Sequence, residues 1–167
     1  AVLDLDSNAL TDTVTTLHSD AALIVDEGRV LQLNRLGMDS IRIYSPGQWT
    51  APSIEFSTGE SSNPHDAQIC DGELFISLYG KDYLGVFDPD SGESLGEVDL
   101  SAWSDGDGLP EAASILELDG TVLVALQRLE DWVAQDGAVV QIECSTQEVI
   151  ASWSVGPNPT LHPIPGQ

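Results

Sequence analysis

Apolar and polar residues alternate in short stretches between residues 62 and 100, and turn-forming residues separate these stretches. Alternation with a period of two is typical of β-strands that bury one face. Asp and Gly at 71 and 72, and the Asp-Pro-Asp-Ser-Gly run at 88–92, are typical of tight turns. The pattern predicts four antiparallel strands, at 66–70, 73–79, 83–87 and 95–100.

The same pattern occurs three times along the chain. The turn glycines Gly28, Gly72 and Gly120 are 44 and 48 residues apart, and each begins a similar apolar strand. An acid followed by Ala lies upstream of each turn, and third strands are expected at 40–44, 83–87 and 138–143. Four short strands in about 40 residues match one blade of a β-propeller. We therefore predict an all-β fold of propeller blades.

The repeat divides the chain into about three complete blades with partial blades at both ends. Residues 2–7 resemble residues 86–91, so we expect a third strand there and a fourth near 13–17. Because a closed propeller needs about 4–8 blades, the chain is predicted to be part of a larger propeller, with assembly from several copies as the alternative. The predicted units are the end of a blade (1–17), blades at 18–57, 62–100 and 111–155, and the start of a next unit (156–167).

Several runs carry a resemblance to a known family: HSDA, NRLG, SNPHDA, DPDSGESLGEVDLSAW, DGDGLPEA and VALQRL. Together they resemble a bacterial cell-surface or lipoprotein β-propeller family related to YVTN-type propellers. The resemblance covers nearly the whole chain and implies the propeller fold, but this subgroup has no function to carry over. The YVTN tetrapeptide itself is replaced by FISL at 75–78.

The charge is strongly negative, with 28 acidic against 5 basic residues and a net charge of −23. Such a surface repels nucleic acid and anionic lipid, so we expect neither as a partner. An acidic surface suits a saline or calcium-rich exterior. No apolar run approaches ~18 residues, so no membrane span is expected. We expect an extracellular, periplasmic or cell-surface location.

Two cysteines, Cys70 and Cys144, stand outside any CxxC spacing and do not indicate a metal site. Cys70 ends a first strand, whereas Cys144 ends a third strand of the next blade. These positions need not bring their Cα atoms within the ~7 Å that a disulfide requires. The sequence leaves their pairing open, with unpaired thiols slightly favoured.

The loops that enter each first strand and those that join second to third strands share one face of a propeller. Asp20, Asp66 and Glu111 are expected at one repeat position, and Arg35, Tyr79 and Arg128 at another. One interpretation is a polar funnel for a ligand or metal. The other, which we favour, is that the acids cap loop amides and pair with the arginines, because recurring residues in repeats usually serve architecture. The candidate residues on this face are His18, Asp20, Arg35, His65, Asp66, Tyr79, Glu111 and Arg128.

Asp105-Gly-Asp-Gly108 resembles the start of a calcium loop, in which alternate carboxylates face the ion. No EF-hand follows, because Leu109 and Leu116 occupy ligand positions. Asp99 or Glu111 would have to complete an irregular Ca²⁺ site with Asp105 and Asp107. The alternative is a plain acidic turn, and no other cofactor is expected.

No GxSxG, P-loop or HExxH motif occurs. We therefore predict a secreted or surface-exposed, non-catalytic propeller that acts as a binding or assembly module. Its expected partners are a protein, a glycan, further chain of the same propeller, or a second copy; Trp132, in an insertion at 130–136, is the aromatic most expected at a contact. The alternatives are a metal-dependent hydrolase or lyase with its site at the channel mouth, and a self-assembling structural subunit.

Overall fold

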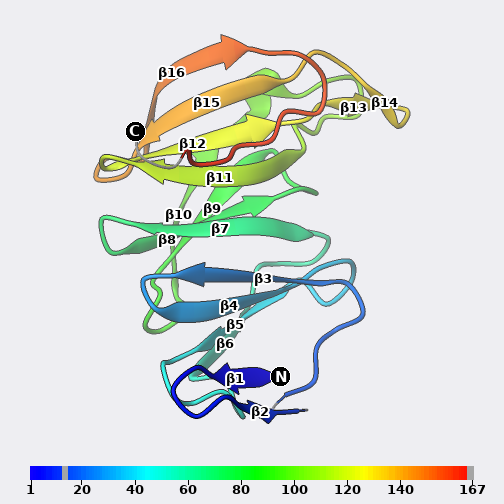
Figure 1. The fold of residues 1–167 in the computed structure, drawn as a ribbon. Coiled ribbons are helices and arrows are strands. Elements are labelled where there is room, and N and C mark those ends of the chain that lie inside the picture. Colours follow the sequence, from blue (N-terminus) through cyan, green and yellow to red (C-terminus); the bar gives the residue numbers. More distant parts are fainter. Residues whose placement is uncertain (13–14, 165–167) are drawn as a thin grey trace.

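Three four-stranded antiparallel sheets follow one another along the molecule (Figure 1). The computed structural model describes residues 1–12 and 15–164. The first blade contains β3 (Ala21–Asp26), β4 (Arg29–Asn34), β5 (Ser40–Tyr44) and β6 (Ile54–Ser57). The second contains β7 (Pro64–Cys70), β8 (Glu73–Leu78), β9 (Tyr83–Phe87) and β10 (Ser94–Asp99). The third contains β11 (Ala112–Leu118), β12 (Thr121–Leu126), β15 (Ala138–Glu143) and β16 (Glu148–Ser154).

The turns between first and second strands are alike in all three blades. Each has two residues of positive φ, an acid followed by glycine: Glu27 and Gly28 at 44° and 74°, Asp71 and Gly72 at 50° and 80°. Asp119 with its glycine repeats this at 49° and 79°. Such turns match the right-handed twist of a β-hairpin. The repeat and the three expected third strands are confirmed.

A smaller sheet, β1 (Val2–Asp4) and β2 (Ala9–Thr11), lies beside the first blade (Figure 1). The Asp4 carboxylate accepts the amides of Asp6 and Ser7, just as Asp88 accepts those of Asp90 and Ser91 after β9. By this likeness β1 and β2 correspond to the third and fourth strands of a blade.

The position expected for the second strand of that sheet was wrong. The partner of β1 is Ala9–Thr11 rather than a strand near 13–17, because Asn8, with φ of 52°, closes a short turn. Residues 15–17 form no strand, and residues 13 and 14 lie outside the described part of the chain.

The insertion in the third blade forms a hairpin of β13 (Leu129–Glu130) and β14 (Val133–Ala134). A short 3₁₀ helix, η1 (Ser101–Trp103), begins the connection from the second to the third blade. Among the described residues, no helix has the length and apolar character needed to cross a membrane.

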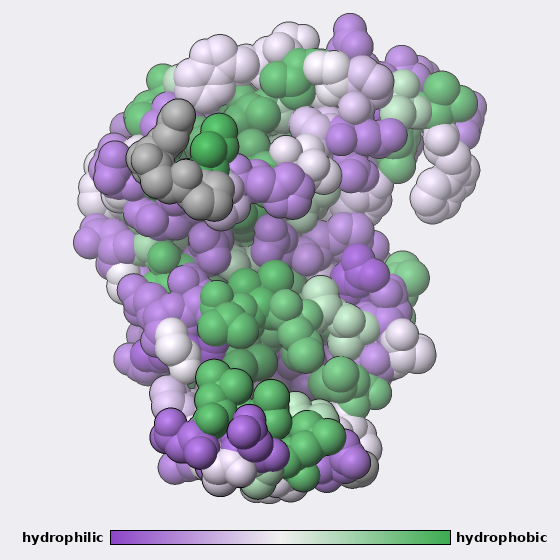
Figure 2. Space-filling view, in the orientation of Figure 1, coloured by the Kyte–Doolittle hydropathy of each residue, from purple (hydrophilic) through white to green (hydrophobic). Residues whose placement is uncertain are grey.

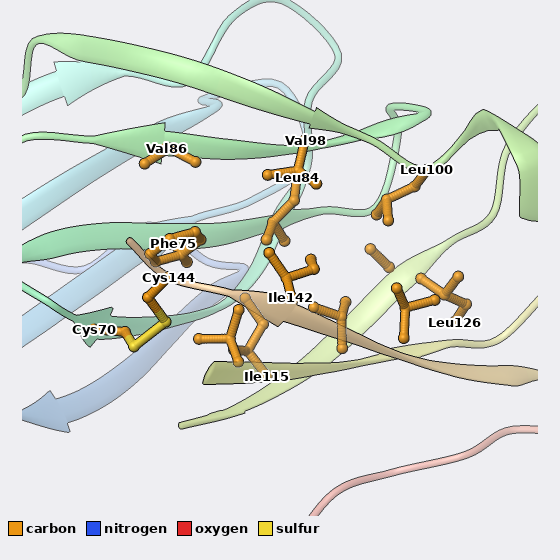
Figure 3. Close-up of a cluster of buried hydrophobic side chains, with 14 of the residues drawn as sticks. Cys70, Phe75, Leu84, Val86, Val98, Leu100, Ile115, Leu126, Ile142 and Cys144 are labelled. Atoms are coloured by element: carbon orange, nitrogen blue, oxygen red, sulfur yellow. A yellow bond between two sulfur atoms is a disulfide. The ribbon is translucent and has the colours of Figure 1, made fainter. Parts of the chain in front are cut away.

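The core lies between blades, where neighbouring sheets pack face to face. One cluster joins the first and second blades and includes Leu33, Ile41 and Ile76. The other joins the second and third blades and includes Phe75 and Ile142, which lie near one another in Figure 3. Burial of these strand faces is the main stabilising contribution to each interface.

Cys70 and Cys144 form a disulfide, visible in Figure 3, with Cα atoms 6.0 Å apart. The expectation of unpaired thiols was therefore wrong. Strand positions within each blade predicted no proximity, but β7 packs directly against the third blade, and both cysteines lie at the same end of the two sheets. Both side chains are also buried, which is usual for structural cysteines.

The segment after β16 forms no strand through residue 164, but it lies against the third blade. The amide of Leu161 donates to Ser114 Oγ on β11 at 3.0 Å. The ring of Pro159 also lies so close to Gly137 that a Cβ there would meet it at 2.7 Å.

Candidate functional site

The entry loops of the three blades are aligned by one recurring backbone hydrogen bond. The amides of Arg35, Tyr79 and Gln127 donate to the carbonyls of Asp20, Asn63 and Glu111, at 3.0, 3.1 and 3.1 Å. The equivalent residues at the entry position are thus Asp20, Asn63 and Glu111, and those on the facing loop are Arg35, Tyr79 and Gln127.

Two predicted equivalences were therefore wrong. Asp66 lies within β7, opposite Ser77, and Arg128 lies one residue beyond the repeat position that Gln127 occupies. The acid-Ala pair of the second blade lies further into its strand, because Asp66 is three residues beyond Asn63, after the irregularity between Pro64 and Asp66. Gln127 lies seven residues after its turn glycine, as Arg35 and Tyr79 do, whereas Arg128 lies eight.

Asp20 and Arg35 form an ion pair on this face, with Arg35 Nε 3.2 Å from Asp20 Oδ1. His18 Nδ1 accepts the amide of Asp20 at 3.3 Å, within the same entry turn. The pairing of an entry-loop acid with an arginine is the architectural role that the sequence favoured. It leaves the Asp20 carboxylate engaged rather than free to bind a metal.

His65 and Tyr79 stack beside this ion pair, with ring centroids 4.2 Å apart and planes 17° from parallel. Burial, and then the positive charge of Arg35, lower the pKa of His65 to about 4, although Asp20 opposes the shift. His65 is therefore neutral at pH 7.

The Tyr79 hydroxyl donates to Gln127 Oε1 at 3.1 Å and so links the second blade to the third. Burial, and then the negative charges of Glu111 and Asp107, raise the pKa of Tyr79 to about 12. The phenol stays protonated at pH 7 and acts as a donor across the interface.

Asp66 also joins blades. Its carboxylate accepts the amides of Ala67 and of Ile115 on β11, each at 2.9 Å. Burial raises the pKa of Asp66, and the two amides oppose that shift. Both carboxylate oxygens thus accept backbone amides, one of them from the next blade.

Three carboxylates meet where the connection from the second blade enters β11. Ligand atoms of Asp105, Asp107 and Glu111 all lie within 4.8 Å of one another. Glu111 is only 3% exposed, and its Oε2 accepts the amide of Leu129 at 3.0 Å. Asp105 Oδ2 is buried without a hydrogen-bond partner among the described residues.

Burial is the largest cause that raises the pKa of Glu111, to about 7. The negative charges of Asp107 and Asp105 add to the shift, whereas the Leu129 amide and the charge of Arg128 oppose it. A bound cation would reverse this shift, since it favours the ionised carboxylate.

The predicted calcium ligands are brought together in part. Asp99 does not join the cluster; its carboxylate accepts the amide of Ser101 at 2.8 Å, next to the start of η1. Within the described residues, His18, Asp20, His65 and Asp66 join no metal-ligand cluster. Arg128 donates from Nη1 to the carbonyl of Asp136 at 3.0 Å, and its Nε is buried without a described partner.

A pocket of about 330 Å³ opens beside the carboxylates, under the β13–β14 hairpin. This hairpin overhangs a hollow at the upper right of Figure 2. Trp132, 89% exposed, lies at the tip of the hairpin. The lining combines aromatic, apolar and acidic side chains and includes no Lys or Arg: Asn63, Tyr79, Gly80, Asp107, Leu109, Glu111, Leu129, Asp131 and Trp132.

Four lining residues were not predicted from the sequence as part of a site: Asn63, Leu109, Leu129 and Asp131. The insertion in the third blade was the available indication, because it lengthens the loop next to Tyr79 and Glu111. Its packing over the entry loop, which creates the pocket, is a tertiary contact that periodicity does not report.

Comparisons with known proteins give a fold. No family model and no curated protein matches the sequence. Among solved structures, similarity is found to the WD40 β-propeller domain of Doa1, with a TM-score of 0.57 and 10% identity over 81% of this chain. The chain has the β-propeller fold. It covers 39% of that domain.

Two further propellers resemble this chain. BamB from Moraxella catarrhalis has a TM-score of 0.53 and 15% identity over 79% of this chain, which covers 35% of BamB. Quinohemoprotein alcohol dehydrogenase from Comamonas testosteroni has a TM-score of 0.63 and 12% identity over 83% of this chain, which covers 21% of it. The chain thus spans about a fifth to two fifths of these structures. They include an enzyme as well as a protein not named as one, so the fold alone does not assign a function.

Proposed function

We propose that this chain belongs to an exported, non-catalytic β-propeller that serves as a binding module. The pocket beneath Trp132 would receive a positively charged group of its partner. The composition of the pocket carries this proposal. Its lining includes three carboxylates and two aromatic side chains but no Lys or Arg: Asp107, Glu111, Asp131, Tyr79 and Trp132. Carboxylates bind an ammonium group by charge-assisted hydrogen bonds, and aromatic faces attract it through their quadrupoles.

Export is supported by the Cys70–Cys144 disulfide, since such bonds persist mainly in oxidising compartments. The net charge of −23 supports solubility there and attracts cationic partners. A protein partner that presents a lysine side chain fits the pocket best, because its apolar stem would lie along Leu109 and Leu129.

A second candidate is calcium binding by Asp105, Asp107 and Glu111. The observation that favours it is the buried Oδ2 of Asp105, which has no described partner in a group of three converging carboxylates. Oxygen ligands of this kind suit Ca²⁺. A metal-dependent hydrolase or lyase at the channel mouth has less support, since its expected ligands Asp20 and Asp66 are engaged elsewhere.

Isothermal titration with two probes separates these proposals. Nα-acetyl-lysine methylamide is the organic probe, and its Nζ-acetylated form is the neutral control. We expect the charged probe alone to bind, with about millimolar affinity for so small a ligand. Trp132→Ala should abolish this binding, and Asp105→Asn, which alters a residue outside the lining, should not.

Calcium chloride gives the opposite pattern if the carboxylates form a metal site. Binding heat would then be lost in Asp105→Asn and retained in Trp132→Ala. Equal binding of the charged and neutral lysine probes, or no binding of either, would refute the cationic pocket. Absence of heat with calcium chloride would refute the metal site.

A further inference from the structure

An apolar surface is exposed on the first blade at β3, in the lower centre of Figure 2. Leu23 is 54% and Val25 73% exposed. Counting back from the turn glycine, the equivalents of these residues are Ala67 and Ile69 in the second blade, which are 0% and 4% exposed. The same strand face is thus buried in one blade and open in another.

The structure shows what buries this face elsewhere. β7 packs against β3 and β4, and β11 packs against β7 and β8. The cover is therefore always the first and second strands of the preceding blade. Among the residues that the structure describes, the blade that precedes β3 contributes only β1 and β2, which are equivalent to third and fourth strands.

A groove of about 260 Å³ lies where those two strands would pack. No described strand pairs with the second edge of β1. An unpaired edge next to an apolar groove is a template for strand addition. The apolar lining of the groove comes from Val2, Leu17, Leu23, Val25, Val30, Tyr44 and Trp49.

Hydrogen bonds between blades indicate which side chains a strand covering β3 would need. The amide of Ile115 donates to Asp66 Oδ2 at 2.9 Å, and that of Leu161 to Ser114 Oγ at 3.0 Å. Ile69 donates likewise to Asp26. The first strands β7 and β11 thus receive side-chain oxygen acceptors from the first strand of the preceding blade, and the segment after β16 receives one from β11. Leu23 and Val25 are at the equivalent donor positions, and no side-chain acceptor among the described residues reaches their amides.

We propose that the groove at β3 is the docking surface for a β-hairpin of further propeller chain, which pairs with β1 and completes its blade. The hairpin has apolar side chains toward Leu23 and Val25, and its first strand carries Asp, Asn, Ser or Gln side chains as acceptors. A second copy of this chain is the less suitable occupant. Each copy carries a net charge of −23, and Asp4, Asp26 and Glu27 lie in or next to the strands that border the groove.

The chain's own second blade supplies the probe. Residues 64–84, with Cys70→Ser, are fused directly before Ala1. Because Asp4 is equivalent to Asp88, this junction keeps the register of β8 against β9. The graft then places a first and a second strand ahead of β1, with Asp66 and Gln68 as acceptors.

Amide hydrogen exchange by NMR is the readout. We expect the amides of Leu23 and Val25 to exchange at least about tenfold more slowly in the fusion than in the unfused chain. Fluorescence of an apolar dye should fall. The matched control carries Val25→Asp in the fusion and should restore exchange near the unfused rate. Slow exchange of Val124 and Val140 verifies that each variant is folded.

Unchanged exchange at Leu23 and Val25 in a folded fusion would overturn the proposal. Dimers of the unfused chain by light scattering, with both amides already protected, would overturn it in favour of a second copy. The result is independent of the pocket beneath Trp132, since lysine-probe binding involves neither residue.

Discussion

Glu111 and His65 lie on the same face of the molecule, and their pKa values are shifted in opposite directions. Both shifts arise chiefly from burial, which disfavours the charged form of either group. For Glu111 the neutral form is the acid, and for His65 it is the base. The two side chains therefore bring opposite pH dependences to the same fold.

The sign for Glu111 follows from its raised pKa. The native state binds this proton more tightly than the unfolded state, so its contribution is complete below pH ~4.5 and is lost as pH rises to about 7. We expect Glu111→Gln to abolish this loss of unfolding free energy. The loss is on the order of 2 kcal/mol, less than the pKa shift alone implies, because water in the adjoining pocket screens the carboxylate. Urea unfolding at pH 4.5 and pH 7.5 measures it, with the exposed Glu60→Gln as control.

His65 gives the mirror image. Its pKa is depressed, so its contribution is present above pH ~6.5 and is lost as pH falls to about 4. The same unfolding series on His65→Gln should show a shallower decline in acid than wild type. If the unfolding free energy of Glu111→Gln changed between pH 4.5 and pH 7.5 by as much as that of wild type, the burial assigned to the Glu111 carboxyl would be contradicted.

At this scale the sequence predicted one pairing and missed others. Asp20 and Arg35 pair as expected. Asp66 was placed at the wrong repeat position, because its acid-Ala pair lies three residues further into the strand than the entry residue Asn63. Glu111 meets Asp105 and Asp107 through loop packing, which no spacing rule specifies.

At the scale of elements, the disulfide connects the end of β7 to the residue after β15, across 74 positions. A crosslink over so long a loop lowers the entropy of the unfolded chain substantially. We expect a Cys70→Ser, Cys144→Ser double variant to lose about 3 kcal/mol of unfolding free energy. Guanidinium unfolding tests this, and the double variant should be indifferent to dithiothreitol, whereas wild type should fall to its level.

The strands themselves were largely predictable. The strands at 40–44, 83–87 and 138–143 agree with β5, β9 and β15, since alternating apolar residues between tight turns identify them. The strand expected near 13–17 was wrong because a three-residue strand such as Ala9–Thr11 is too short to establish a period. The disulfide was missed because it depends on how blades pack.

For the whole molecule, the net charge of −23 is the dominant electrostatic feature. Like charges repel more strongly in the compact state than in the expanded chain. Raising the salt from 10 to 150 mM shortens the screening length from about 30 to 8 Å. We expect the thermal midpoint to rise by about 2–4 °C. Calorimetry at both concentrations tests this; a midpoint unchanged by sodium chloride would show that the acids are already compensated.

The repeat made the architecture of the whole molecule predictable, since one four-strand unit recurs with its turns. The interfaces between blades were less so. Tyr79 and Gln127 occupy the same repeat position in neighbouring blades, 48 positions apart, but the hydrogen bond between them depends on side chains that differ from blade to blade. A propeller's periodicity fixes each blade, while the pairings between blades depend on individual side chains.

The disulfide also makes the molecule mechanically unequal along its length. The disulfide crosslinks the second and third blades, whereas the first blade is joined to the second only by the connecting chain and by noncovalent contacts, including a salt bridge from Arg29 to Asp90. A pulling force would peel away the first blade while the other two stayed together as one block. The blade with the open apolar face is thus also the one that the disulfide does not crosslink.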